Sequence, residues 1–209
     1  IASTRLQIET VLKHQLPQEK QEFVLNQALQ ETERLDALVE KILLANSIES
    51  SAYLIQKEHF NLSELCRHTI DKLKTSLLKN NTIHSKIDPD IIVYGDVIAF
   101  NSIITNLLDN ASKYSASQSE INITLQKQND SVSLIIKDEG IGISPAESTK
   151  VFNKFYRTGN EETRHTKGTG LGLYIVNNLV KMHHGSIKID PNQPKGTIFT
   201  IQLNNIKNV

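Results

Sequence analysis

The sequence has a single cysteine, Cys66, and no tryptophan among its 209 residues. One cysteine excludes an internal disulfide and a zinc site built from cysteines, and it suits a reducing compartment. Cys66 lies within the amphipathic stretch LSELCRHTIDKL, where we expect a buried core position. The cysteine content therefore favours a cytoplasmic chain.

Neither sign of charge predominates, and long apolar runs are missing. Lys and Arg total 23, as do Asp and Glu, so no net field attracts nucleic acid or an anionic membrane. No apolar run approaches the roughly 20 residues of a membrane span, and no signal peptide opens the chain. We therefore expect no nucleic-acid partner and no membrane crossing within these residues.

Glycine is absent from residues 1–50, which predicts two helices interrupted by a turn at Pro17. The second helix carries an apolar stripe at three- and four-residue spacing. Because two helices cannot enclose a core alone, we expect this hairpin to pair with a second copy as a dimeric four-helix bundle. The alternative is that the stripe packs on the rest of the chain. The stripe consists of Leu25, Ala28, Leu29, Leu35, Leu38, Val39, Ile42 and Leu43.

Residues 57–209 differ in pattern and predict a second domain, with residues 51–56 as a linker. Alternating strands such as SEINITLQKQ and SVSLIIKD occur here together with three amphipathic helices. Helices grouped against one sheet form an α/β two-layer sandwich. The predicted fold class is thus α+β, a helical hairpin followed by this sandwich.

A polar stripe marks the helix that we expect to begin after Asp96, a plausible N-cap. Asn106, Asn110 and Lys113 fall at i, i+4 and i+7, so they share one face. Amide oxygens suit one coordination position on Mg²⁺, with phosphate oxygens and waters at the others. Lys113 could meet a phosphate. The alternative is an ordinary solvated face.

The stretch SLIIKDEGIGI suggests a second site. Asp138 ends a buried strand, and Gly140 and Gly142 let the backbone approach a flat ligand. A carboxylate held there can accept a hydrogen bond from an exocyclic amine such as that of adenine. The alternative is an Asp-Gly turn in which Asp138 bonds its own backbone.

Three glycines at alternate positions open the stretch GTGLGLYIV, residues 168–176. A phosphate-binding P-loop would need Lys-Ser or Lys-Thr after its last glycine, and a dinucleotide-binding motif would need a preceding strand. Here Leu173 and Tyr174 follow Gly172, and a polar stretch precedes Gly168. Backbone N–H groups at the start of the next helix can still bind phosphate.

The motif FNKFYR, residues 152–157, precedes this loop. Its phenylalanines, Phe152 and Phe155, are expected to pack into the core as a hinge, with Arg157 able to reach a phosphate. The polar stretch TGNEETRHTK between the motif and the glycines has the composition of a lid.

Taken together, NLLDNASKYS, DEGIGI, FNKFYR and GTGLGL occur in this order within residues 106–173. This set resembles the ATP-binding domain of sensor histidine kinases. That family is one branch of the superfamily that contains type II topoisomerase, heat-shock chaperone and mismatch-repair ATPases. The resemblance covers residues 57–209 and implies a Bergerat-type sandwich with ATP between the helices and the lid.

The resemblance also implies roles for individual residues. Asn110 would bind Mg²⁺, Tyr114 would lie near the nucleotide, and Asp138 would bind the adenine amino group above Gly140 and Gly142. The phosphates would be served by Asn106, Lys113 and Arg157 and held by Gly168, Thr169, Gly170, Leu171 and Gly172. One departure is Lys167, where many members have a further glycine.

The residue type at position 106 distinguishes ATP hydrolysis from kinase activity within the superfamily. Hydrolysing relatives place a glutamate, the base that activates water, four residues before the magnesium asparagine. An amide at that position cannot take a proton, so the phosphate should go to a side chain. An ATP-hydrolysing conformational switch and a non-catalytic dimeric scaffold are the alternatives.

The acceptor in the family is a histidine followed by an acid, in a stretch like HELRTPL on the first hairpin helix. The opening IASTRLQIETVLKH resembles the continuation after that Thr-Pro, so we expect a fragment whose acceptor lies upstream. His14 lacks the adjacent acid. The parent would be a homodimer that passes phosphate to an aspartate of a response regulator receiver domain, with membrane attachment only through upstream segments.

Overall fold

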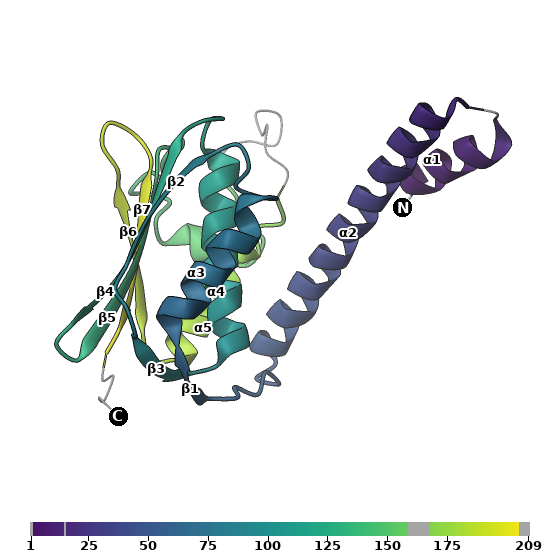
Figure 1. Ribbon diagram of the computed structural model, residues 1–209. Helices are drawn as coiled ribbons and strands as arrows, with labels where there is room; N and C mark the ends of the chain where they lie inside the picture. Colours follow the sequence, from purple (N-terminus) through teal and green to yellow (C-terminus); the bar gives the residue numbers. More distant parts are fainter. Residues whose placement is uncertain (1, 15, 159–167, 205–209) are drawn as a thin grey trace. The chain divides into compact units, whose positions relative to one another are not determined.

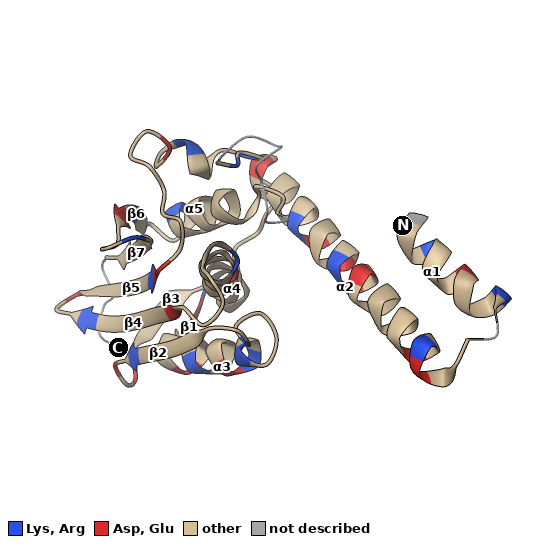
Figure 2. Ribbon diagram, turned by 90° about the horizontal axis from the view of Figure 1, so that it is seen from above, with Lys and Arg blue, Asp and Glu red and all other residues tan. Residues whose placement is uncertain are grey.

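The computed structural model describes residues 2–14, 16–158 and 168–204, and it divides into two units, Ile1–Ser47 and Ile48–Val209. The first unit is a helical hairpin formed by α1 (Ala2–Lys13) and most of α2 (Gln18–Glu49). The carbonyl of Pro17 accepts from the backbone N–H groups of Lys20 and Gln21, which begins α2 at the predicted turn. Residues of both charge signs follow one another along the ribbon of α2 (Figure 2).

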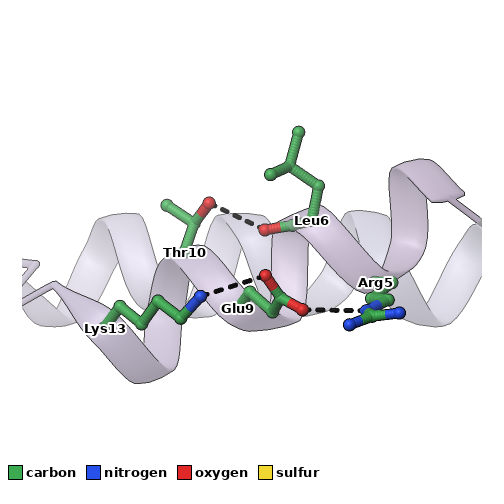
Figure 3. A network of polar contacts seen from close by, with 5 residues as sticks. All are labelled: Arg5, Leu6, Glu9, Thr10 and Lys13. Carbon is green, nitrogen blue, oxygen red and sulfur yellow. Dashed lines mark hydrogen bonds and ion pairs between the residues drawn. The ribbon is translucent and has the colours of Figure 1, made fainter.

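Short-range ion pairs stabilise α1 (Figure 3). Arg5 Nε lies 2.8 Å from Glu9 Oε1, and Lys13 Nζ lies 3.2 Å from Glu9 Oε2. Arg5 foremost, and then Lys13, lowers the pKa of the Glu9 carboxyl below its ordinary value. Within the described part of the chain, no helix is both long and apolar enough to cross a membrane.

The second unit contains a five-stranded sheet whose one face is covered by three helices (Figures 1 and 2). The strand order is β2-β4-β5-β7-β6, with β2 and β4 parallel and the other pairs antiparallel. The strands are β2 (Thr82–Ile87), β4 (Glu120–Gln128), β5 (Ser131–Asp138), β6 (Ser186–Pro191) and β7 (Thr197–Leu203). The helices are α3 (Leu62–Lys74), α4 (Val97–Tyr114) and α5 (Gly172–Met182), and a short helix η1 (Lys150–Phe152) precedes α5. The predicted α+β class with a two-layer sandwich is confirmed.

The core lies between the sheet and the helices. Alternate residues of β5 are buried, as the sequence pattern predicts, and the apolar face of α4 is fully buried against them. Cys66 on α3 exposes none of its surface, and burial raises the pKa of its thiol to about 12. The predicted core position of Cys66 is confirmed.

One strand pair lies outside the main sheet and departs from expectation. Strand β3 (Ile92–Gly95) pairs antiparallel with β1 (Glu58–Asn61), a strand that the sequence pattern does not predict. The ring of His59 lies 4.9 Å from that of Tyr94 across this pair. Four residues are too few for a periodic signal, so β1 depends on its partner strand.

Asp96 begins α4 and joins three segments of the second unit. Its Oδ1 accepts from Ala99 N–H at 3.0 Å as the predicted N-cap, and its Oδ2 accepts from the Gln56 backbone N–H and the Tyr53 hydroxyl, each at 3.1 Å. Its own N–H donates to Nε2 of His183, the residue that caps α5, at 3.0 Å. Burial raises the pKa of Asp96, but these hydrogen bonds outweigh it and lower the pKa overall.

We predict that Asp96→Ala lowers the free energy of unfolding by about 1–2 kcal/mol, because it removes an N-cap. Since the pKa of Asp96 is lowered in the folded protein, the advantage of wild type over Asp96→Asn should be complete at pH 7. It should be lost as the pH falls below about 3.9, the ordinary pKa of an aspartate. Urea unfolding of wild type and Asp96→Asn, at pH 7 and at the lowest pH where both are folded, measures this difference in stability. An advantage that does not shrink would contradict the prediction.

Candidate functional site

Asn106 on α4 presents a buried oxygen that has no hydrogen-bond partner among the described residues. The residue is 4% exposed, and its Nδ2 donates to the Ser102 carbonyl at 2.9 Å. Because a carbonyl can only accept, the NH₂ group of the Asn106 amide must be the one that points to Ser102. Its Oδ1 therefore points away from Ser102. A Cβ built on Gly172 would lie 3.1 Å from this Oδ1, so the oxygen faces the start of α5. Leaving such a group unpaired typically costs about 1–3 kcal/mol, which is unusual outside a functional site.

The first turn of α5 has no side-chain cap. Leu171, the residue before the helix, makes no capping bond through its side chain, and its own N–H bonds Thr169 Oγ1 at 3.3 Å. The first intrahelical bond runs from Ile175 N–H to the Leu171 carbonyl. The N–H groups that open a helix carry a partial positive charge and bind anions.

Asn110 and Lys113 lie further along α4. The Asn110 side chain is half-buried and lies one turn after Asn106. From the sequence, we expect Lys113 to meet a phosphate. In the structure its ammonium pairs with the carboxylate of Asp109, a residue four positions earlier that is 7% exposed. Any phosphate at Lys113 would therefore share the ammonium with Asp109.

Asp138 ends β5 and is 3% exposed. Its Oδ1 accepts from the N–H groups of Gly140 at 2.8 Å and Thr197 at 3.1 Å. Burial raises the pKa of this carboxyl, and the two N–H donors offset only part of that effect. Every hydrogen bond that the described residues make to the carboxyl ends on Oδ1. The Asp-Gly turn considered for the sequence is thus present, while Oδ2 keeps its acceptor capacity.

The glycines after Asp138 lie against other backbone segments. A Cβ on Gly140 would lie 2.6 Å from the Tyr114 carbonyl, which accepts from Ile141 N–H at 3.1 Å. Gly142 has a φ of +79°, and a Cβ there would lie 3.2 Å from the Gly196 carbonyl. The loop that follows Asp138 therefore touches both the end of α4 and the β6–β7 turn.

The motif FNKFYR meets the glycine loop through its backbone. Phe155 N–H donates to the Gly170 carbonyl at 3.1 Å, and Arg157 lies beside Gly168. The core position expected for Phe155 is wrong: the residue is 61% exposed and has a φ of 64°, because the backbone turns to bond Gly170. The predicted lid, residues 158–167 with Lys167 at its end, lies outside the described residues except for Thr158.

Tertiary contacts thus form two groups, one near the middle of α4 and one at its C-terminal end. One group brings Asn106 to Gly172, and the other brings Tyr114, Gly140 and Asp138 together. Sequence reasoning missed three contributors. Asp109 could have been found from its i, i+4 spacing to Lys113, and Thr197 follows a glycine in a tight turn. Nothing in the sequence indicated Asn192, whose Nδ2 donates to the Asp138 carbonyl at 2.7 Å.

Within the described residues, no three His, Cys, Asp or Glu side chains cluster as metal ligands. The amide oxygens of Asn106 and Asn110, four residues apart on α4, are the neutral donors that could serve a metal here. Amide oxygens suit Mg²⁺ when phosphates and waters supply its remaining ligands. The donors present fit that combination.

Comparison with known proteins identifies the family. Residues 95–206 match the model of the histidine kinase-, DNA gyrase B- and HSP90-like ATPases, and the chain belongs to this family. Sensor protein SrrB of Staphylococcus aureus is 33% identical over 181 residues, which is 84% of this chain. The match spans only 30% of that relative's length.

Solved structures agree. A mycobacterial sensor histidine kinase, MprB, is 28% identical with a TM-score of 0.64, covering 73% of this chain and all of that one. The full-length histidine kinase ShkA, solved in complex with AMPPNP, shares the fold with a TM-score of 0.74 at 19% identity, over 99% of this chain and 44% of that one. The second unit is accordingly an ATP-binding domain of the sensor histidine kinase type, which confirms the predicted resemblance.

We predict that Gly170→Ala destabilises the protein whereas Gly168→Ala does not. Gly170 has a φ of +71°, and a Cβ there would lie 2.6 Å from the backbone of Phe155. A left-handed conformation alone costs a non-glycine residue about 1–2 kcal/mol, and the overlap adds to that cost. The nearest atom to a Cβ on Gly168 is the Arg157 side chain at 3.9 Å. Thermal unfolding of both variants measures the difference; equal midpoints would contradict the prediction.

Proposed function

We propose that this chain is most of the kinase core of a two-component sensor histidine kinase, which binds Mg²⁺-ATP to phosphorylate a histidine. The phosphoryl group then passes to an aspartate of a response regulator. The observation that carries the proposal is the buried, unpartnered Oδ1 of Asn106 beside the uncapped start of α5. Here an acceptor oxygen and an anion-binding helix end lie next to each other, the pairing that a metal-bound phosphate requires.

Two regions along α4 would divide the nucleotide between them. Near the middle of the helix, Gly168, Thr169, Gly170, Leu171 and Gly172 would bind the phosphates together with Arg157. At its C-terminal end, Asp138 would accept from the adenine amino group through Oδ2, with Gly140 and Gly142 beneath the base and Tyr114 nearby. The burial of Asp138 and its fixed Oδ1 support this assignment.

Asn110 is the proposed Mg²⁺ ligand, since its half-buried amide lies four residues after Asn106, on the same face of α4. Asn106 acts on the phosphates indirectly, because Oδ1 is an acceptor and phosphate oxygens are acceptors too. It would bind the metal or a metal-bound water. Bound Mg²⁺ neutralises phosphate charge, and catalysis of phosphoryl transfer is mostly positioning and charge neutralisation.

Kinase chemistry is favoured over ATP hydrolysis by the lack of a general base at position 106. The nearest carboxylate along α4, that of Asp109, is already paired with Lys113. None of the histidines present has the expected acidic neighbour, so we propose that this chain binds ATP but does not phosphorylate itself. The exposed apolar side chains of α2 support the proposed homodimer. They include Leu25, Leu29, Val39, Ile42 and Leu43.

We predict that Asp138→Ala lowers the affinity for Mg²⁺-ATP at least about tenfold, because a buried acceptor for the amino group is lost; tenfold is about 1.4 kcal/mol. Isothermal titration of ATP in the presence of Mg²⁺ measures the affinity. A second titration with excess EDTA should show weaker ATP binding by wild type, because the metal is removed. Asp130→Ala, in the exposed turn at the other end of β5, is the matched control and should bind as wild type does. Equal affinity of Asp138→Ala and wild type would refute the adenine assignment.

Incubation with γ-labelled ATP separates the alternatives. We expect neither acid-labile phosphate on this chain nor steady release of phosphate into solution. Acid-labile label would show that a histidine such as His14 accepts the phosphoryl group. Continuous phosphate release would favour the hydrolysing switch. Failure to bind ATP at all would favour a non-catalytic scaffold.

A further inference from the structure

The β6–β7 turn contacts the proposed adenine site through Asn192. This residue is 5% exposed, and its Nδ2 donates to the backbone carbonyl of Asp138, 54 residues earlier, at 2.7 Å. Its own N–H donates to the Gly196 carbonyl at 3.0 Å, which closes the turn. Asn192 therefore joins the turn to the end of β5.

The turn passes directly against Asp138. Gly196 has a φ of +121°, and a Cβ there would lie 2.0 Å from the Asp138 carbonyl oxygen, so only glycine fits. The next residue, Thr197, donates its N–H to Asp138 Oδ1 at 3.1 Å. The same turn thus contacts Asp138 on its main chain and on its side chain.

The Asn192 side chain takes no part in the pairing of β6 with β7. The β6–β7 ladder runs from Ser186 opposite Gln202 to Pro191 opposite Thr197, and its hydrogen bonds are backbone bonds. The Asn192 amide instead leaves the hairpin and bonds the neighbouring strand β5. Its bond is thus directed at Asp138, beyond what the turn itself requires.

We propose that Asn192 is a positioning residue for adenine recognition. This role rests on the proposed function. Asn192 holds the turn at a fixed distance from Asp138, so that the Thr197 N–H keeps its hydrogen bond to Asp138 Oδ1. With Oδ1 bound by two N–H groups, the carboxyl cannot rotate and Oδ2 is the oxygen presented to an amino group. Asn192 would therefore contribute to selectivity for a 6-amino purine without touching the nucleotide.

The test is a double-mutant cycle of Asn192→Ala and Asp138→Ala, read out as binding affinity by isothermal titration. Each protein is titrated with ATP and with purine riboside triphosphate, which has hydrogen in place of the amino group. Asn192→Ala should weaken ATP binding about 5- to 20-fold, the effect of one buried hydrogen bond. It should leave binding of the analogue unchanged, and it should have no further effect on ATP binding in the Asp138→Ala background.

Controls separate positioning from folding. Gln193→Ala, at an exposed position in the same turn, should bind both nucleotides as wild type does. Thermal unfolding confirms that each variant folds. If Asn192→Ala does not fold, Asn192→Ser makes a smaller cavity and carries the same comparison, because its hydroxyl is shorter than the amide.

Three results would overturn the inference, and the third also removes the adenine assignment. Equal losses for both nucleotides, or a loss that persists in the Asp138→Ala background, would mean that Asn192 only stabilises the turn, while the adenine assignment stands. If Asp138→Ala itself leaves ATP affinity unchanged, the adenine assignment fails and the positioning role fails with it.

Discussion

The carboxylate of Asp96 is the junction on which the arrangement of the second unit depends. This carboxylate caps α4 and accepts from the Gln56 N–H and the Tyr53 hydroxyl, and the backbone N–H of Asp96 donates to the ring of His183 at the end of α5. One end of α4 and one end of α5 are therefore held at a single point. The proposed phosphate site lies away from this junction on both helices. Asn106, near the middle of α4, meets Gly172 at the opposite end of α5. Because helices are stiff, fixing them at this junction constrains the relation between Asn106 and Gly172.

A second junction acts at the other end of α4. The Tyr114 carbonyl accepts from Ile141, and Gly140 packs against it, so the loop after β5 is tied to the helix. The same loop carries Asp138, which the β6–β7 turn holds from the opposite side. Close approach of three backbones is possible only because glycines stand at positions 140 and 196. The proposed base and phosphate sites are thus connected through α4.

Much of this architecture is predictable from sequence because it depends on local patterns. The 3.6-residue period of α4, the alternation along β5 and the N-cap at Asp96 each follow from a few neighbouring residues. The motifs around Asn106, Asp138 and Gly170 could be located for the same reason. Strand β1 could not, because four residues carry no period and the strand forms only against β3. We expected Lys113 to bind a phosphate. In the structure it pairs with Asp109, one turn earlier on α4, which would compete with a phosphate for the ammonium.

The sequence by itself determined the fold class, the family and the positions of the motifs, since these depend on residue type and spacing along the chain. Only the tertiary structure decided which atoms are engaged. It turned the Asn106 amide so that its oxygen is the unpaired atom, bound one oxygen of Asp138 to two N–H groups, and exposed Phe155 by engaging its backbone. It also brought Asn192 to Asp138 across 54 residues. These outcomes depend on contacts between distant segments, which spacing along the chain does not encode.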